Sequence, residues 1–283
     1  MIKTLAALVA ALALVGATNF YTRHAESGPA LEVLTVKSPP DTSMTLQCFN
    51  TQQDDSRQRA ALVTTQSFGL DQVRLTRSAL LCQSARLLYQ RDGQVIQRSH
   101  RSLTHPQTAQ CYQLEQGATP ARQPVLWQSA DFGVDSITLG PAEMLCQQAQ
   151  TAHSLPGDGP PIDQTSHPSG AISLLCYGVR DAGSPATPAI LETPFYGKDA
   201  VTIGYLALLC ETAGVSWVDE SKNAGRPTGQ VWGCYQLEQG AEPNTRAVLD
   251  FADLGSDLGM ELVMVGQASL MCRQGQIRPI ASP

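Results

Sequence analysis

The chain has 283 residues, a formal charge of -6 at pH 7, and only 16% charged residues. A slightly acidic chain without a basic patch excludes nucleic acid as an expected partner. Few charges, together with 23 glycines and 18 prolines, favour short strands and ordered loops over long surface helices.

Residues 1–17 have the pattern of a secretory signal peptide. Lys3 precedes an apolar run from Leu5 to Ala17 that ends in small residues. The run is shorter than the roughly 20 apolar residues of a transmembrane helix. We predict cleavage near Thr18 and a secreted mature chain, periplasmic or extracellular, without a transmembrane segment. An uncleaved N-terminal anchor is the alternative, and residues 18–38 are predicted to be a linker.

The rest of the chain contains four copies of one repeat, each with two cysteines. The clearest match is Cys111-Tyr-Gln-Leu-Glu-Gln-Gly-Ala, which recurs identically from Cys234. Weaker copies begin at Cys48-Phe49 and Cys176-Tyr177. Every copy closes with two apolar residues and a second cysteine, and the closing cysteines are Cys82, Cys146, Cys210 and Cys272. We predict repeat domains at residues 39–92, 104–153, 168–219 and 229–283.

Two apolar positions recur nine and seven residues before each closing cysteine. They are Val73 and Leu75, Ile137 and Leu139, Val201 and Ile203, and Val263 and Val265. A spacing of two places both side chains on one face of a strand. A glycine thirteen residues before each closing cysteine predicts a turn that leads into this strand: Gly69, Gly133, Gly197 and Gly259. The predicted fold class is mainly β, with four tandem small disulfide-bonded β-rich repeats.

Eight cysteines in an exported chain predict a disulfide framework. We favour pairing within repeats, which treats every copy alike: Cys48–Cys82, Cys111–Cys146, Cys176–Cys210 and Cys234–Cys272. The alternative pairs Cys82 with Cys111, Cys146 with Cys176 and Cys210 with Cys234. It is expected to leave Cys48 and Cys272 at opposite ends of the protein. Eight cysteines admit about 105 pairings, so the sequence alone does not decide between them. No Cys-x-x-Cys motif indicates zinc or redox chemistry.

The frame of Cys-Tyr, Phe-Gly, an alternating strand and Leu-Leu-Cys resembles an uncharacterised tandem repeat domain, a domain of unknown function. It occurs in secreted proteins of Gram-negative bacteria. The motifs that carry the resemblance are Cys111-Tyr112, Phe132-Gly133, Leu145-Cys146, Cys176-Tyr177 and Leu208-Leu209-Cys210. The resemblance covers nearly all of the chain after residue 39. Phe49 and Leu258 depart from it, and the lysines that usually follow Cys-Tyr are absent. It implies architecture and export, and it carries no assigned catalysis.

No polar constellation recurs from copy to copy. Four histidines lie in or at the edges of the predicted connectors, where roles in turns or in solvent are expected: His100, His105, His153 and His167. The acids Asp250, Asp253 and Asp257 suggest calcium, but they lack an EF-hand loop and solvated acids are favoured. No Gly-x-Ser-x-Gly motif occurs. We therefore predict no catalytic, cofactor-binding or metal-binding residues and no cofactor.

The expected function is that of an exported non-enzymatic repeat protein with a structural, surface-interaction or adhesion-type role. Its expected partner is a cell-surface or extracellular protein or polysaccharide. One alternative is a secreted hydrolase or inhibitor, which a cluster of His105, His167 and acids would favour. Another is a glycan- or ligand-binding module, which Trp217 and Trp232 on an open surface would favour. The tryptophans, which include Trp127, do not recur between copies, so packing in the core is expected.

Overall fold

The computed structural model describes residues 44–52, 59–98, 107–116, 124–154, 173–218, 223–224, 226–251 and 260–280. These residues belong to one compact unit. Within these ranges all regular structure is β, which confirms the predicted mainly-β class, and no helix is long and apolar enough to cross a membrane. The predicted signal peptide and linker lie outside the described residues.

The strands follow the same order in four successive segments of the chain. Each segment begins with a cysteine strand: β1 (Thr45–Gln52), β6 (Thr108–Gln116), β9 (Ser173–Arg180) and β13 (Val231–Glu238). An outer strand comes next: β2 (Arg59–Thr65), β7 (Pro124–Ser129), β10 (Thr187–Thr193) and β14 (Thr245–Asp250). A long strand completes the segment: β3 (Gly69–Ser84), β8 (Gly133–Ser154), β11 (Gly197–Trp217) and β15 (Met260–Pro279). Three further strands are β4 (Arg86–Arg91), β5 (Gln94–Arg98) and β12 (Asn223–Ala224).

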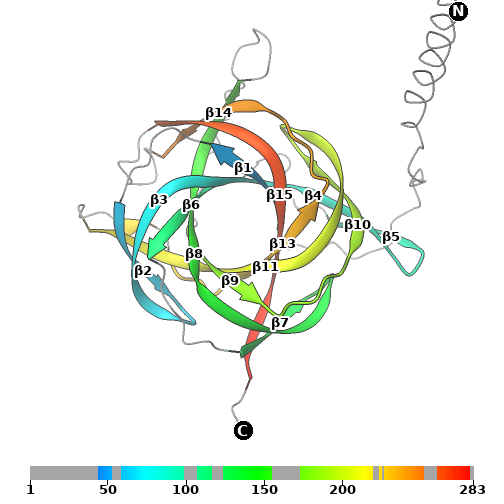
Figure 1. Cartoon of the computed structure of the whole chain (residues 1–283), viewed down its shortest axis with the longest axis horizontal. Helices are drawn as coiled ribbons and strands as arrows, with labels where there is room; N and C mark the ends of the chain where they lie inside the picture. Colours follow the sequence, from blue (N-terminus) through cyan, green and yellow to red (C-terminus); the bar gives the residue numbers. More distant parts are fainter. Residues whose placement is uncertain are drawn as a thin grey trace, which may run out of the picture. The chain divides into compact units, whose positions relative to one another are not determined.

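The cysteine strands and long strands form a closed ring of eight antiparallel strands. Each cysteine strand pairs with the long strand of its own segment and with the long strand of the segment before it. The first cysteine strand, β1, pairs with the last long strand, β15, and this pairing closes the ring. Figure 1 looks along the axis of the ring.

The ends of the long strands leave the ring and build outer sheets. The first part of each long strand pairs with the outer strand of its own segment. The last part of β8 pairs with β14, that of β11 with β2, and that of β15 with β7. In the first segment, β4 continues beyond β3 and pairs with β10. Every outer strand therefore lies between its own long strand and a strand from the segment two positions away.

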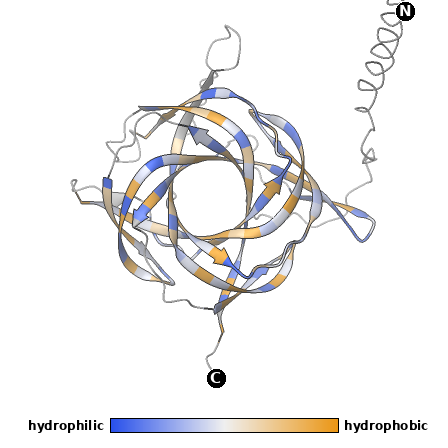
Figure 2. Ribbon diagram, in the orientation of Figure 1, coloured by the Kyte–Doolittle hydropathy of each residue, from blue (hydrophilic) through white to orange (hydrophobic). Residues whose placement is uncertain are grey.

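Alternation along the strands places apolar side chains in one large core. All eight recurrent apolar positions from Val73 to Val265 are buried, as the spacing of two predicted. Figure 2 shows this alternation of apolar and polar residues along the ribbons. The predicted turn glycines Gly69, Gly133 and Gly197 have φ of 84, 88 and 73°, a conformation that glycine adopts without steric cost. Gly259 lies outside the described residues.

The recurrent aromatic residues pack between segments two positions apart. The ring after the first cysteine meets the ring before the turn glycine: Phe49 with Tyr196, and Tyr177 with Phe68, both at 4.6 Å between centroids. Tyr235 and Phe132 repeat the contact at 4.7 Å. In the remaining place, where the sequence has Leu258 instead of an aromatic residue, Tyr112 packs on Phe251 at 6.4 Å. The two aromatic motifs of the repeat are thus the two halves of one contact.

Candidate functional site

Four disulfides lie on the axis of the strand ring. They join Cys48 to Cys82, Cys111 to Cys146, Cys176 to Cys210 and Cys234 to Cys272. These are the pairs that the sequence analysis favours, and they bridge neighbouring strands with Cα atoms 3.8–3.9 Å apart. Four disulfides indicate an oxidising, extracytoplasmic compartment.

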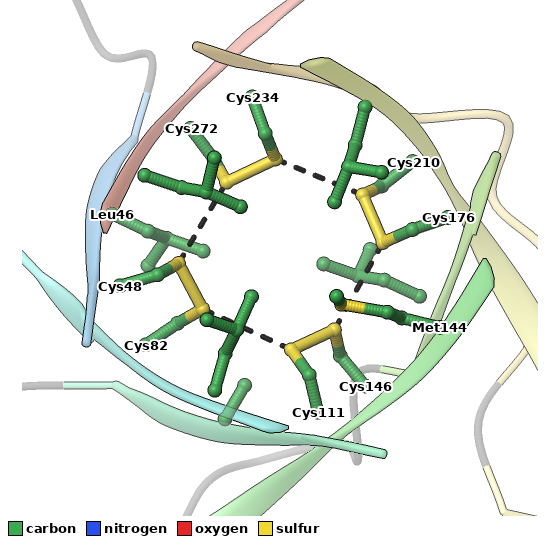
Figure 3. A pocket seen from close by; sticks show the side chains of 15 residues that line it. Leu46, Cys48, Cys82, Cys111, Met144, Cys146, Cys176, Cys210, Cys234 and Cys272 are labelled. Carbon is green, nitrogen blue, oxygen red and sulfur yellow. Dashed lines mark hydrogen bonds between the residues drawn. A yellow bond between two sulfur atoms is a disulfide. The ribbon is translucent and has the colours of Figure 1, made fainter. Parts of the chain in front are cut away.

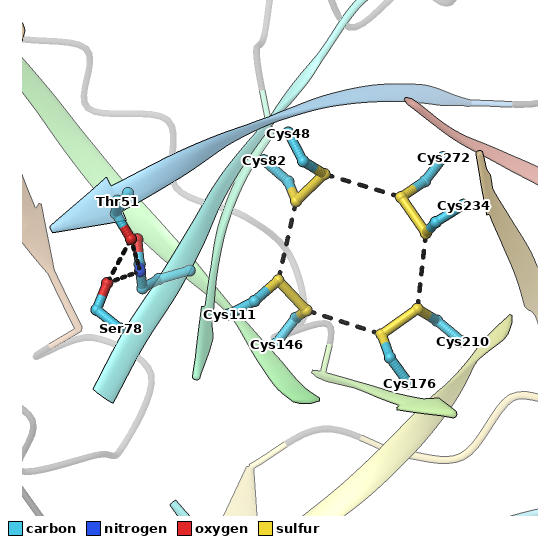
Figure 4. Close-up of a disulfide and its surroundings, with 11 residues drawn as sticks. Cys48, Thr51, Ser78, Cys82, Cys111, Cys146, Cys176, Cys210, Cys234 and Cys272 are labelled. Atoms are coloured by element: carbon cyan, nitrogen blue, oxygen red, sulfur yellow. Dashed lines mark hydrogen bonds between the residues drawn. A yellow bond between two sulfur atoms is a disulfide. The ribbon is translucent and has the colours of Figure 1, made fainter. Parts of the chain in front are cut away.

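The eight sulfur atoms form a closed ring of contacts, which Figure 4 shows. Between one disulfide and the next, Sγ atoms lie 3.8 Å apart at Cys48 and Cys272 and 3.8 Å apart at Cys82 and Cys111. The other two gaps are 3.9 Å, at Cys146 and Cys176, and 3.7 Å, at Cys210 and Cys234. A disulfide sulfur carries no proton, so these approaches are van der Waals contacts rather than hydrogen bonds.

The positions of Cys48 and Cys272 correct one sequence expectation. The alternative pairing across connectors was expected to leave these two cysteines at opposite ends of the protein. That expectation is wrong, because β1 pairs with β15 and brings the two Sγ atoms to 3.8 Å. Because the ring of strands is closed, the first and the last cysteine of the chain are neighbours in space.

Apolar side chains pack around the axis next to the sulfur ring (Figure 3). The residues two before the first cysteines are Leu46, Ala109, Leu174 and Trp232. The residues two before the closing cysteines are Leu80, Met144, Leu208 and Leu270. A spacing of two puts each on the face of its cysteine, and antiparallel strands separate the two sets along the axis. The cavity left between them is about 10 Å³ and wholly apolar, which is at most the space of one water molecule. The axis is a packed plug.

A second small cavity lies at one end of this plug. Met44, Gln107, Gln148 and Trp232 line it, and its volume is about 20 Å³. The indole Nε1 of Trp232 is buried and has no hydrogen-bond acceptor among the described residues. The cavity is on the scale of single waters rather than of a substrate.

A buried polar residue follows every closing cysteine, and in the third and fourth segments it bonds to another segment. The four residues are Gln83, Gln147, Glu211 and Arg273. Glu211 Oε1 accepts hydrogen bonds from the backbone N and the Oγ of Ser67, both at 3.0 Å. Arg273 Nε donates to Asp131 Oδ2 at 2.5 Å. Ser67 and Asp131 precede the turn glycines of segments two positions away. The sequence patterns did not predict this contact, although a polar residue follows the closing cysteine in all four copies.

Asp131 is the centre of a buried charged network. Its Oδ1 accepts hydrogen bonds from Tyr89 Oη at 2.9 Å and from Arg98 Nε at 2.7 Å. Arg273 binds the other carboxylate oxygen and also donates through Nη1 to Thr45 Oγ1 at 2.9 Å. The Asp131 side chain is fully buried, and that of Arg273 is 1% exposed. Burial, together with the Asp131 charge, raises the pKa of Tyr89 to about 12. This network links the first, second and fourth segments. Because the Asp131 side chain is fully buried, a substrate could not reach the carboxylate.

Two further carboxylates are buried beside neutral donors. Burial raises the pKa of Glu211, and hydrogen bonds from Ser67 oppose part of that rise. Burial also raises the pKa of Asp199, whose Oδ2 accepts from Gln47 Nε2 at 2.8 Å and from the backbone N of Ala241 at 2.9 Å. Each carboxylate accepts hydrogen bonds from other segments, so we assign both of them a role in stabilising the fold.

The three tryptophans are core residues. Trp127 is fully buried and its Nε1 donates to Tyr235 Oη at 2.9 Å. Trp217 and Trp232 are also buried, so neither lies on the open surface that a glycan site would need. Arg59 lies over the Trp217 ring, with its Cζ 6.0 Å from the centroid.

The histidines and acids flagged by sequence do not form a site in the described part of the chain. His153 lies in β8, paired with Ala247 of β14, and Asp250 is the last residue of β14. The others lie outside the described residues: His100, His105, His167, Asp253 and Asp257. Among the described residues no group of three His, Cys, Asp or Glu side chains is placed to hold a metal ion.

Comparisons of the chain with protein-family models, with curated proteins and with solved structures find no match. The resemblance to an uncharacterised repeat domain therefore stays a prediction. The class of the protein therefore follows from its fold and its disulfides alone. It is an all-β protein whose strands close into a ring around four disulfides.

Proposed function

We propose that the protein is an exported, non-enzymatic interaction protein that uses its disulfide-centred ring as a rigid scaffold and binds a partner with its outer sheets. The recurrent cysteines and the recurrent apolar strand positions of the four segments are buried, and apolar side chains fill the axis. These positions serve folding. A partner surface is therefore expected on the outward faces of the sheets and in the loops that differ between segments.

The outward face of the sheet formed by β3, β2 and β11 supports this proposal most strongly. Leu62 is 39% exposed, and Leu70 and Val218 are 64% and 54% exposed. Leu62 of β2 lies opposite Gln72 of β3 and Ser216 of β11. Leu70 lies opposite Thr64, two residues after Leu62. The backbone N of Val218 donates to the backbone O of Ala60, two residues before Leu62. Leu70 and Val218 are thus the diagonal neighbours of Leu62 on either side. We call Leu62, Leu70 and Val218 the aliphatic patch.

The chemistry of the aliphatic patch favours a protein partner over a polysaccharide. Contiguous exposed apolar side chains typically mark surfaces for protein contact. Sugar-binding surfaces instead use aromatic platforms, and the three tryptophans are buried. An extracellular or cell-surface protein is therefore the partner class proposed for this patch.

A capture experiment tests the proposal. The immobilised exported protein is exposed to solubilised cell-surface proteins, and captured proteins are compared for the wild type and the triple variant L62S/L70S/V218S. All three positions are exposed, so the fold should be retained. The control variant is Val134→Ser, because Val134 is 60% exposed on a different outer sheet.

The expected result is a specific partner that the wild type and the Val134→Ser variant capture and the triple variant does not. Capture by all three proteins would exclude the aliphatic patch as the binding surface. Turnover of a small molecule by the purified protein, without any captured partner, would contradict the proposed function itself.

A further inference from the structure

Every cysteine sulfur in the ring has two sulfur neighbours. One is its disulfide partner, and the other belongs to the next disulfide at 3.7–3.9 Å. Thiol–disulfide exchange proceeds when a thiolate attacks a sulfur of an existing disulfide. A thiolate at any position in this ring would therefore already touch the sulfur that it must attack.

The contacts define a second complete pairing of the eight cysteines. It consists of Cys48–Cys272, Cys82–Cys111, Cys146–Cys176 and Cys210–Cys234. Like the observed pairing, it leaves no cysteine single, because the ring of strands is closed. It joins successive segments instead of the two strands within one segment.

Strand register favours the observed pairing. Cys48 lies opposite Cys82 in β3, but it lies opposite Leu270 in β15, two residues from Cys272. Diagonal neighbours of this kind lie about 7–8 Å apart, beyond the roughly 4.4–6.8 Å between Cα atoms that disulfides usually span. The Cα atoms of the observed pairs are only 3.8–3.9 Å apart. A bond across a gap therefore needs a small movement of the strands. The second pairing should appear only when one bond of the ring is missing.

We propose that the eight sulfurs act as a relay, in which a missing disulfide bond moves around the ring by successive exchange. A small-molecule thiol or phosphine first reduces Cys48–Cys82 to two thiols. The Cys48 thiolate attacks Cys272, forms Cys48–Cys272 and releases the Cys234 thiolate, which takes up the proton that Cys48 lost.

The following steps repeat the same chemistry. Cys234 attacks Cys210 and releases Cys176, and Cys176 attacks Cys146 and releases Cys111. Each step forms one S–S bond and breaks one, so the relay itself consumes no electrons. It ends with thiols at Cys82 and Cys111, whose sulfurs are neighbours at 3.8 Å. A small disulfide such as oxidised glutathione can then accept two electrons and two protons and close the last bond.

The relay makes the ring tolerant of reduction at a single place. Without it, a reduced bond could re-form only between its own two cysteines. With it, the two thiols separate and travel, and re-oxidation at any gap restores four bonds. This property concerns the scaffold and does not depend on the partner proposed for the aliphatic patch.

The variant Cys82→Ala tests the relay, because it leaves one thiol in a ring of seven sulfurs. The exported protein is purified, quenched in acid, alkylated with N-ethylmaleimide and mapped without reduction. The relay predicts Cys48–Cys272 bonds and alkylation at Cys234, Cys176 or Cys111. Alkylation of Cys48 alone, with the other three native bonds intact, would overturn the proposal. The matched control, C48A/C82A, has no starting thiol and should show native bonds only.

A second measurement keeps the test valid if the Cys82→Ala variant fails to fold. The folded wild-type protein receives a substoichiometric amount of a trialkylphosphine and is quenched and mapped in the same way. The relay predicts molecules whose two alkylated cysteines come from different native bonds, always with bonds between ring neighbours. Alkylated pairs drawn only from single native bonds would refute it. The same treatment in guanidinium should instead give bonds between cysteines that are not neighbours in the ring.

Discussion

Removing the Asp131 carboxylate should destabilise the protein more than any change at its surface. In the variant Asp131→Ala, Arg273 and Arg98 lose the carboxylate that both bind, and the side chain of Arg273 is only 1% exposed. Breaking a buried ion pair by removing one partner costs about 3–5 kcal/mol, because the remaining charge stays buried. We expect the free energy of unfolding to fall by about that amount, measured by denaturant unfolding with the disulfides intact.

A double-mutant cycle combines Asp131→Ala with Arg273→Gln, which introduces the residue found at the equivalent positions Gln83 and Gln147. Asp131 keeps Arg98 in this variant, so the loss should be smaller than for Asp131→Ala. The double variant removes both partners and should cost less than the sum of the two single changes by about 1–3 kcal/mol. A cost below about 1 kcal/mol for Asp131→Ala, or strictly additive effects, would refute the assignment of Asp131 as the anchor of a buried charge network.

Three further predictions follow from other buried groups. Burial raises the pKa of Glu211 above its ordinary 4.5, so the contribution of Glu211 to stability is fully present below about pH 4.5 and is lost as the pH rises through the raised value. The variant Glu211→Gln should reduce that loss in thermal melts recorded from about pH 4 to about pH 8, and an unchanged pH dependence would contradict the burial effect. The double variant C176A/C210A opens a loop with a sequence separation of 34 and should lose roughly 3–4 kcal/mol of unfolding free energy in denaturant; an unchanged midpoint would count against the framework. The variant Tyr235→Phe leaves Trp127 Nε1 without its acceptor and should cost about 1–3 kcal/mol in the same assay, and no change would show that the bond contributes little.

The local features of each segment were predictable because their causes are local. A spacing of two identified the buried face of each long strand, and glycine marked the turn before it. The favoured disulfides join positions only 34–38 residues apart within one copy of the repeat. Such pairs need no knowledge of how the copies are arranged.

The exchange of strand ends between segments was not predictable from the same patterns. The four outer strands have similar alternation, so alternation does not specify which long strand adds to which outer strand. The pairing of β15 with β7 and the contact of Arg273 with Asp131 link residues more than a hundred positions apart. The contact between Arg273 and Asp131 had one signal in the sequence. Arg273 stands where the first copy has Gln83, and Asp131 stands where the first copy has Ser67.

The central claim is that the four segments complete one another in a closed ring and do not fold as separate modules. The direct test is denaturant unfolding of a chain that ends at Arg226 and therefore lacks β13, β14 and β15. That chain removes partners of β1, β7, β8 and β11. We predict that the shortened chain shows no cooperative unfolding transition and forms non-native disulfides. Cooperative unfolding of the shortened chain, with native bonds and a midpoint close to that of the full chain, would contradict the claim.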